Sequence, residues 1–321
     1  MIVCITGATG FIGRKVAEFH LNSNDDVRYL TRTNDKPLHG AKVFLGDVNS
    51  AEEDLAPFLK NADVIYHCAG EVENEALMHR THVEGVRNLL NIVEKVNIKM
   101  QKQYQWIQLS SCGAYGQNAK SRTVERFVNE ISFENPNGEY ERTKTEADQL
   151  IISFAKKHDF LKFTIIRPTI VFGPGMRSTA IIRLSNLIKR RVFFYVGNKN
   201  AVANYVHVDD VVCAMTLSSK KTAAHNQTFI VSNDCKFSDF INVIADTFSV
   251  PRPRLVLNEL ILRKFITIVG RWVKLPISNE YIDVMMRQTY YSNDKLKKYL
   301  NWSPKASVLA QLKEYMGVIS C

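Results

Sequence analysis

Three polar side chains, Ser111, Tyr140 and Lys144, have the types and spacing of a proton-transfer centre. Tyr140 and Lys144 stand four residues apart in a segment with helical periodicity, so their side chains share one face, one turn apart. A free tyrosine has a pKa of about 10, and a nearby ammonium would favour its ionised form. Tyr140 could then exchange a proton with a substrate oxygen that Ser111 orients.

The spacing of Tyr140 and Lys144 also occurs on solvated helix faces, so it needs support from elsewhere in the chain. Gly7, Gly10 and Gly13 stand at three-residue intervals between a β-branched run and a segment with helical periodicity. The first would form a tight turn, the second would let a pyrophosphate approach, and the third would let the helix pack closely on the strand. Because a helix N-terminus offers free N–H groups to phosphates, the sequence predicts a dinucleotide site.

The type of dinucleotide is predicted from the residues that follow the second expected strand. An acidic residue there would bind the ribose 2′-hydroxyl of NAD, whereas an arginine suits a 2′-phosphate. Thr31 and Arg32 occupy this place, so we expect NADP(H) to be preferred over NAD(H). A solvated surface arginine is the alternative. Asp47, after the third expected strand, could bind the adenine or could cap the next turn.

The elements that must position these residues alternate regularly in the first half of the chain. Runs rich in β-branched and aromatic residues predict strands, and segments with helical spacing of apolar residues predict helices. This pattern predicts an α/β fold with a doubly wound parallel sheet, or Rossmann arrangement. The expected strands are 2–6, 26–31, 41–46, 62–70, 104–111 and 163–173, and the expected helices are 10–21, 82–96 and 140–158.

The regular alternation stops after about residue 173. Helical pieces at 179–191 and 237–248 are mixed with loops, and a strand near 205–232 returns to the sheet. We therefore divide the chain into a dinucleotide-binding domain, 1–172, and a smaller, mostly helical substrate-binding part, 173–321. Ligands of open α/β sheets bind at the carboxyl ends of the strands, where this second part is expected.

The composition fits a globular protein handling phosphorylated molecules. The formal net charge of +10 suits nucleic acid, an anionic membrane or polyanionic small molecules. No zinc-finger or RNA-binding signature is present, so we expect no nucleic-acid partner. The six cysteines show no CxxC pairing, and we expect reduced thiols in the cytoplasm. The N-terminal residues lack the basic leader of a signal peptide, and no apolar run is long enough to cross a bilayer.

Seven motifs occur in the order found in one known family. They are TGATGFIG (6–13), GDV (46–48), HCAG (67–70), SSCGAYG (110–116), YERTK (140–144), RPTIVFGPG (167–175) and YVHVDD (205–210), and SNDKLKKYLNWSPKASVLAQL closes the chain. The sequence thus resembles the extended short-chain dehydrogenase/reductase family of epimerase/dehydratase type, whose members modify nucleotide sugars.

The resemblance implies roles for individual residues. Ser111, Tyr140 and Lys144 would be catalytic, without a metal, and two helices would form a homodimer. Substrate contacts are expected at Ser111, Cys112, Tyr140 and Arg177. Besides the three glycines, Arg32, Asp47, Tyr140 and Lys144, the expected cofactor contacts are Thr9, Phe11, Ile12, Val48, Cys68, Ala69, Gly70, Pro168 and Val171.

The chain departs from the family pattern at two places. His82 and Val86 stand where members often have Asn and Thr, so His82 could make the local hydrogen bonds or act as a base; we expect the structural role. Ala203 stands where many nucleotide-sugar enzymes have an arginine for the diphosphate. Alternative cations for that group are Arg177, Lys189, Arg252 and Arg254, although each of them alone is better explained as a solvated charge.

Residues 255–275 form an apolar segment with interspersed Arg and Lys. Such a helix could lie on an anionic membrane, cover the substrate cleft or form a dimer contact. We expect it to pack on the C-terminal part.

The favoured function is reduction of a keto group, at C4, of a nucleotide-activated sugar by NADPH. The segment NQTFIVSND (226–234) resembles bacterial reductases of 4-keto-6-deoxy amino sugars. The alternatives are an NAD-dependent nucleotide-sugar 4-epimerase, a dehydrogenase or reductase for an apolar alcohol or ketone, and a non-catalytic protein that senses NADP.

Overall fold

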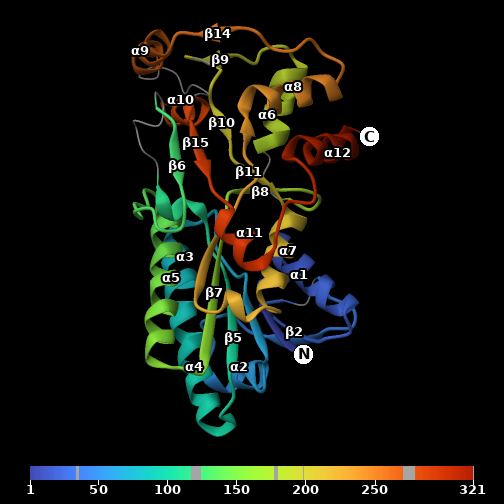
Figure 1. Ribbon diagram of the computed structural model, residues 1–321, viewed down its shortest axis with the longest axis vertical. Helices are drawn as coiled ribbons and strands as arrows, with labels where there is room; N and C mark the ends of the chain where they lie inside the picture. Colours follow the sequence, from blue (N-terminus) through green and yellow to red (C-terminus); the bar gives the residue numbers. More distant parts are fainter. Residues whose placement is uncertain (34–35, 117–123, 177–179, 198, 270–278, 321) are drawn as a thin grey trace.

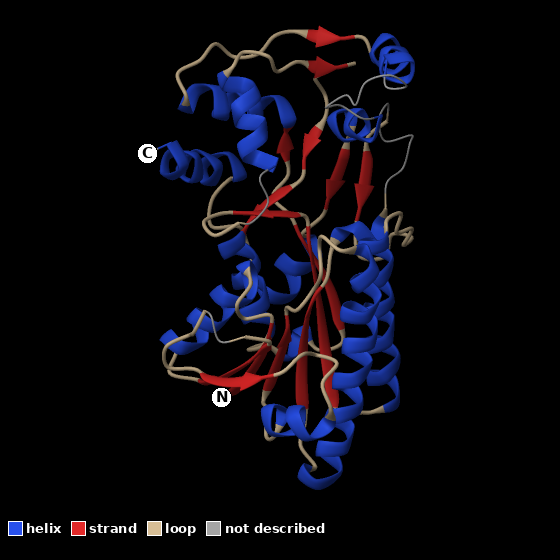
Figure 2. Ribbon diagram, turned by 180° about the vertical axis from the view of Figure 1, so that it is seen from behind, coloured by secondary structure: helices blue, strands red, loops and turns tan. Residues whose placement is uncertain are grey.

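The computed structural model describes residues 1–33, 36–116, 124–176, 180–197, 199–269 and 279–320. Figure 1 and Figure 2 show two stacked parts. One contains the main sheet with helices on both of its faces, and the other contains shorter helices and small sheets.

Seven strands form the main sheet, in the order β12-β7-β5-β4-β1-β2-β3, and every neighbouring pair is parallel. The chain order reverses between β1 and β4, which is the switch point of a doubly wound sheet. The predicted α/β fold class is therefore confirmed. The strands are β1 (Ile2–Thr6), β2 (Asp26–Thr31), β3 (Lys42–Leu45), β4 (Val64–His67), β5 (Tyr104–Leu109), β7 (Leu161–Pro168) and β12 (Gln227–Val231).

Helices cover the two faces of this sheet and bury separate apolar clusters against it. Val16 of α1 and Met215 of α7 pack on one face, while Leu89 of α4 and Ile151 of α5 pack on the other. The helices of this part are α1 (Phe11–Asn22), α2 (Glu52–Leu59), α3 (Glu75–His79), α4 (Gly85–Met100), α5 (Glu139–Lys157), α7 (Val208–Ser218) and α11 (Asp294–Leu300), with the π-helix η1 (Arg80–Glu84) and the 3-10 turns η2 (Cys112–Tyr115) and η4 (Thr222–Ala224).

A third apolar cluster holds the other part together, around Phe172, Phe240 and Leu312. Its helices are α6 (Ala180–Lys189), α8 (Phe237–Thr247), α9 (Glu259–Val269), α10 (Asn279–Met286) and α12 (Val308–Ser320). Its two-stranded sheets pair β8 (Ile170–Phe172) with β11 (Tyr205–His207), β9 (Tyr195–Val196) with β14 (Val256–Leu257), β10 (Val202–Ala203) with β13 (Cys235–Lys236), and β6 (Arg126–Val128) with β15 (Thr289–Tyr291).

The predicted run 163–173 is divided in the structure, because β7 ends at Pro168 and β8 begins at Ile170. β7 belongs to the main sheet, whereas β8 pairs with β11 in the other part. The segment therefore carries the chain from one part to the other, and one of the cavities described below lies along it.

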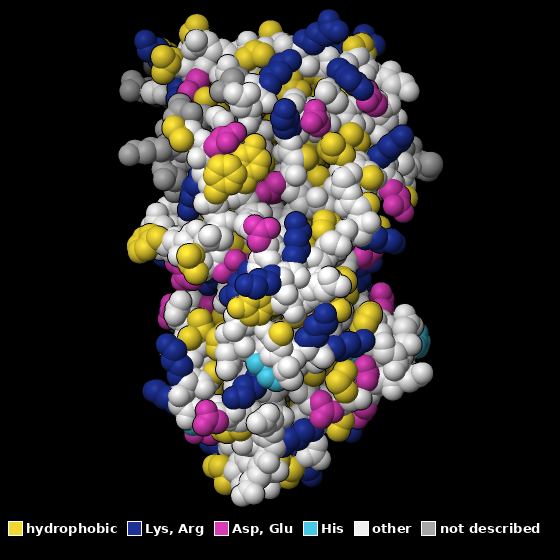
Figure 3. Space-filling view, viewed as in Figure 1, with side chains coloured by type: hydrophobic (Ala, Val, Ile, Leu, Met, Phe, Trp, Pro, Cys, Tyr) yellow, Lys and Arg dark blue, Asp and Glu magenta, His cyan; other side chains and the backbone are white. Residues whose placement is uncertain are grey.

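The surface chemistry is mixed. On the face shown in Figure 3, Lys and Arg side chains are spread among Asp and Glu rather than gathered in one stripe. The five cysteines within the described residues are free thiols. Within the same residues, every helix is too short or too polar to cross a lipid bilayer.

Candidate active site

The glycine loop closes tightly between β1 and β4. Gly7 has φ +70°, and a Cβ placed on it would lie 2.6 Å from the backbone nitrogen of Ala69. A Cβ on Gly13 would lie 2.3 Å from the Gly7 carbonyl oxygen. Only glycine fits at either position, so Gly7 makes the turn and Gly13 lets α1 pack against it.

The N-terminus of α1 is well suited to a phosphate. Gly10 caps this helix without a side-chain hydrogen bond, and its first turn contains no acidic residue. The first N–H groups and the positive end of the helix dipole therefore remain for an anionic ligand. These features fit the pyrophosphate of a dinucleotide, as the glycine spacing predicts.

A cleft of about 590 Å³ adjoins this loop at the carboxyl ends of β1, β2 and β4. Glu71, which sequence reasoning missed, also lines the cleft, and its carboxylate accepts hydrogen bonds from the N–H groups of residues 72, 73 and 74. These bonds, with the charge of Arg32, hold the pKa of Glu71 below its usual range. The predicted cofactor residues that line this cleft are Gly7, Thr9, Gly10, Arg32, Asp47, Val48, Cys68, Ala69 and Gly70.

Asp47 has a local structural role as well as a place in the cleft. Its carboxylate accepts hydrogen bonds from the backbone and side-chain nitrogens of Asn49, at 3.0 and 3.3 Å. The Ser50 hydroxyl accepts one from the Asp47 N–H. Asp47 therefore does cap its own turn, which was the alternative to a role in binding adenine. A bound adenine would share the Asp47 carboxylate with the nitrogens of Asn49.

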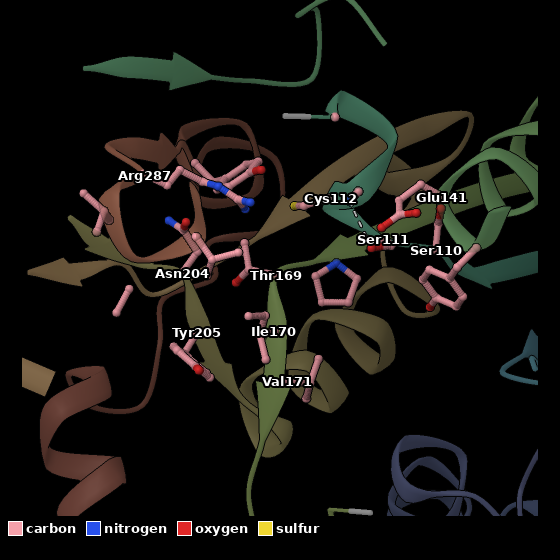
Figure 4. A pocket seen from close by; sticks show the side chains of 18 of the residues that line it. Ser110, Ser111, Cys112, Glu141, Thr169, Ile170, Val171, Asn204, Tyr205 and Arg287 are labelled. Atoms are coloured by element: carbon pink, nitrogen blue, oxygen red, sulfur yellow. Dashed lines mark hydrogen bonds between the residues drawn. The ribbon is translucent and has the colours of Figure 1, made fainter. Parts of the chain in front are cut away.

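A second cavity, of about 500 Å³, lies between the two parts of the molecule. Figure 4 shows Ser111 and Cys112 on the same side of it, with Val171 below. Lys144, Phe11 and Gly13 line neither cavity, and Arg177 lies outside the described residues. The predicted residues brought together here are Ile12, Ser111, Cys112, Tyr140, Pro168 and Val171.

Helix α5 brings Tyr140 and Lys144 to this region. The helix begins after Gly138, and Glu139 and Glu141 in its first turn suit the helix dipole. Burial raises the pKa of Tyr140 to about 12, with a further contribution from the negative charges of Glu141 and Asp148. The phenol is therefore protonated at neutral pH in the protein alone.

Lys144 does not line this cavity, and its ammonium lies near the other cleft, since a Cβ on Gly70 would lie 4.0 Å from Nζ. Its ammonium donates a hydrogen bond to the Leu109 carbonyl, and the residue as a whole is 4% exposed. Burial lowers its pKa, while the nearby Asp148 and Cys68 oppose that effect. Ser111 is placed by its own turn, since its hydroxyl oxygen accepts the Gly113 N–H at 3.0 Å. Its O–H proton remains to donate to a ligand.

Asp148 lies on α5 four residues after Lys144, which itself lies four residues after Tyr140. The sequence analysis predicted no role for Asp148. Its carboxylate accepts hydrogen bonds from the Ser110 hydroxyl at 2.7 Å and from Nε and Nη2 of Arg167 at 3.1 and 2.9 Å. Both charged side chains are almost completely buried. The pair joins α5, the end of β5 and the end of β7, so it fixes the strand end that carries Ser111.

His82 is held by both ring nitrogens. Nε2 accepts the Glu71 N–H at 2.9 Å, so Nδ1 carries the proton and donates it to the Thr143 hydroxyl at 2.8 Å. That hydroxyl in turn donates to the Glu139 carbonyl. Burial and the charge of Lys144 lower the pKa of His82 to about 3. The ring is therefore neutral and structural, which agrees with the favoured interpretation of its place in the sequence.

His82→Gln tests this role. Since the imidazole stays neutral above about pH 4, the replacement should leave the shape of the kcat/KM profile between about pH 5 and 9 unchanged. We expect a modest loss of thermal stability, because a hydrogen bond to Thr143 or Glu71 is weakened. Steady-state kinetics across this pH range would check it. Loss of a titration near pH 6 to 7 would show that His82 acts as a base.

Comparison with known proteins agrees with this architecture. A model of the NAD dependent epimerase/dehydratase family matches residues 3–232. The UDP-glucose 4-epimerase of Vibrio cholerae is 24% identical over 97% of this chain and 93% of its own length. The decarboxylating sterol-4-alpha-carboxylate 3-dehydrogenase of Saccharomyces cerevisiae is 21% identical over 95% and 94%.

A solved structure has the same fold. UDP-glucose 4-epimerase from Thermotoga maritima, crystallised with UDP-glucose, has a TM-score of 0.76 and 21% identity, covering 100% of this chain and 99% of that one. The family model matches most of the chain, and the fold and the glycine loop agree with it. The chain belongs to the NAD dependent epimerase/dehydratase family.

Proposed function

We propose that this protein is an oxidoreductase that uses a nicotinamide dinucleotide, with Tyr140 as its acid–base residue. One observation carries the proposal. Ser111 and Tyr140 line a cavity that is also lined by Ile12, from the helix of the glycine loop, and by Pro168 and Val171. A dinucleotide whose pyrophosphate sits on that helix could thus extend its nicotinamide towards the two hydroxyls.

The protein side chains would handle the proton. A bound dinucleotide would supply the hydride for a ketone or accept it from an alcohol. Tyr140 is protonated at neutral pH, so its phenol can donate a proton to the ketone oxygen during reduction. Ser111 would donate a hydrogen bond to the same oxygen. The buried charge of Lys144, near the end of β5, would favour the tyrosinate left after transfer.

The substrate that we propose is a nucleotide-activated sugar with a keto group at C4. Relatives named UDP-glucose 4-epimerase support a nucleotide sugar, because they cover almost the whole chain. A phenol that is protonated before the transfer can give its proton to a ketone oxygen, which is the step that reduction requires. A 4-epimerase, which must first oxidise its substrate, is the second candidate, and those same relatives favour it.

The two candidates differ in cofactor turnover. Purified protein would be mixed with NADPH or NADH and a panel of 4-keto-sugar nucleotides, and loss of absorbance at the reduced-nicotinamide band would be followed. We expect stoichiometric oxidation of the reduced cofactor. Conversion of UDP-glucose to UDP-galactose by tightly bound NAD, without net oxidation, would instead identify an epimerase. If dinucleotide binds and neither reaction occurs with any sugar nucleotide, the proposed substrate is wrong.

Preference for NADP(H) is part of the proposal and depends on Arg32. This exposed side chain lines the cofactor cleft directly after β2, where a ribose 2′-phosphate would lie. Arg32→Asp should lower the ratio of NADPH to NADH affinity by about 10- to 100-fold, because a charge-assisted contact is replaced by repulsion. Titration calorimetry with both cofactors would measure it. Lys60→Asp, the same charge change away from the cleft, should leave the ratio unchanged. An unchanged ratio in Arg32→Asp would contradict the preference.

A further inference from the structure

Helix α9 lies with β9 and β14 at one end of the molecule (Figure 1), and one of its sides is anchored to the protein. On that side Leu262 and Ile266 pack against the third apolar cluster. Arg263 joins the same helix to α10, with 2.5 Å between its Nη2 and a carboxylate oxygen of Asp283. The expected packing of this segment on the C-terminal part is thus confirmed for the described residues, whereas residues 270–275 of it lie outside them.

The other side of α9 is apolar and open to solvent. The side chains concerned recur at the spacing of one helix face, and the packed residues alternate with them on the opposite face. The exposed residues are Leu260 (68% exposed), Ile261 (70%), Phe265 (52%) and Ile268 (63%), with the exposed Lys264 among them. An apolar helix face that stays exposed in the folded chain indicates a surface that binds something else.

The surroundings of this face are strongly basic. Residues 189–199, which end α6 and form β9, contain four Lys and Arg and no acidic residue. Residues 252–269, which form β14 and α9, contain four more and one acidic residue, Glu259, which is paired with Arg263. In these two stretches the exposed cations without an ion pair to a described residue are Lys189, Arg190, Arg191, Lys199, Arg254 and Lys264. Figure 3 shows Lys and Arg beside hydrophobic side chains at this end of the molecule.

The combination of an apolar face with basic surroundings fits an anionic lipid surface. The boundary between acyl chains and headgroups can take up the apolar side chains, and anionic headgroups attract the cations. A second copy of this chain would bring the same excess of positive charge onto the face and would be repelled. The eleven residues of α9 extend about 16 Å, far less than the roughly 30 Å of a bilayer core, so the helix could lie on a membrane but not cross it.

A second group of exposed apolar side chains lacks the basic surroundings. Phe127, Ile131 and Phe133 are 73%, 92% and 84% exposed. The stretch that carries them, 124–134, contains three Glu and a single Arg. An anionic surface would repel this stretch, so exposure of apolar side chains alone does not select it as a membrane contact.

We propose that α9 lies on the surface of an anionic phospholipid bilayer. Its axis would run along the membrane plane, because the apolar face extends from Leu260 to Ile268. Phe265 would enter the region where the acyl chains meet the headgroups. The Lys264 ammonium would reach the headgroup phosphates while its methylene groups stay beside the apolar side chains. The contact would hold the protein at the membrane reversibly, since one short helix buries only a few side chains.

Vesicle flotation with the full chain would test this contact. Protein would be mixed with vesicles of phosphatidylcholine alone or with about 30% phosphatidylglycerol added, and then centrifuged through a density gradient. We expect wild type to float with the anionic vesicles and far less with the neutral ones. The double variant Ile261→Glu with Phe265→Glu should no longer float, because it places two carboxylates in the apolar face. Lys264→Gln should lower the partition coefficient about fivefold, the usual contribution of one basic residue at such a surface.

A matched control uses the other exposed apolar group. Ile131→Glu with Phe133→Glu introduces the same charges away from α9 and should float as wild type does. All of these side chains are exposed, so each variant should keep the thermal unfolding midpoint of wild type.

Two flotation results would overturn the proposal: wild type that does not float with anionic vesicles, or an Ile261→Glu, Phe265→Glu variant that floats as well as wild type. Light scattering provides a third test. A dimer in solution that Phe265→Glu dissociates would show that a second copy covers the face instead of lipid.

Discussion

Tyr140→Phe is expected to lower the rate of hydride transfer by about 10²- to 10⁴-fold, the usual contribution of a general acid or base. The replacement removes only the phenolic oxygen, so the ring still packs edge-to-face against His82, with centroids 5.5 Å apart. The cofactor cleft at Gly7 and Arg32 is untouched, and dinucleotide affinity should stay within about twofold. Single-turnover measurements with NADPH would give the rate, and titration calorimetry would give the affinity.

Cys112→Ser is the matched comparison. Cys112 also lines the cavity, but its thiol is buried and donates to the Arg167 carbonyl at 3.0 Å. Burial raises the pKa of this thiol far above its usual range, so it stays protonated and is no nucleophile at neutral pH. The serine variant should therefore retain hydride transfer to within about tenfold. Full activity in Tyr140→Phe would refute the acid–base role, whatever the substrate.

Arg167→Met is expected to have the largest effect on stability. The Arg167 guanidinium is the cationic partner of the Asp148 carboxylate, in a place with almost no solvent. Removing it leaves a buried charge unpaired, which costs about 3 to 5 kcal/mol of unfolding free energy. The loss should be smaller in acid, because a carboxyl without its cation has a raised pKa and is neutralised there. Denaturant unfolding at about pH 5 and pH 8 would measure both effects.

Two further variants test whether the loss of stability comes from leaving a buried charge unpaired or from removing any arginine charge. Replacing both partners, as Asp148→Leu with Arg167→Met, should recover part of the lost free energy, since no unpaired charge remains. Arg252→Met breaks an exposed pair with Asp246 and should give no measurable change. If Arg167→Met is as stable as wild type at both pH values, Asp148 and Arg167 do not hold the end of β5.

The sheet could be predicted because its signals are local. Each expected strand of the first half is a short run of β-branched or aromatic residues, and each helix has one apolar stripe. Gly7 and Gly13 marked two close backbone contacts, and the structure shows why no larger residue fits there. The break between β7 and β8 was missed, because the run through Thr169 and Ile170 has the same composition on both sides.

The site could be predicted only where a residue's role follows from its neighbours in sequence. Ser111 and Tyr140 line the cavity as expected, whereas Lys144 does not and is bonded to the Leu109 carbonyl. Asp148 and Arg287 were missed because the residues around them come from distant segments. The spacing of Tyr140, Lys144 and Asp148 was a usable signal for Asp148. For Arg287 no sequence pattern showed that its side chain would line the cavity.

A crystal structure of the protein with an oxidised nicotinamide dinucleotide would test the central claim most directly. We predict that the pyrophosphate lies on the N-terminus of α1 and that the nicotinamide contacts Pro168 and Val171. The reactive carbon of the nicotinamide and the Tyr140 phenol should face each other across a space that can hold the reacting carbon and oxygen of a substrate. Each pair of reacting atoms would then be about 3 to 3.5 Å apart. A nicotinamide that points out of the cavity, or a phenol turned away from it, would contradict the account.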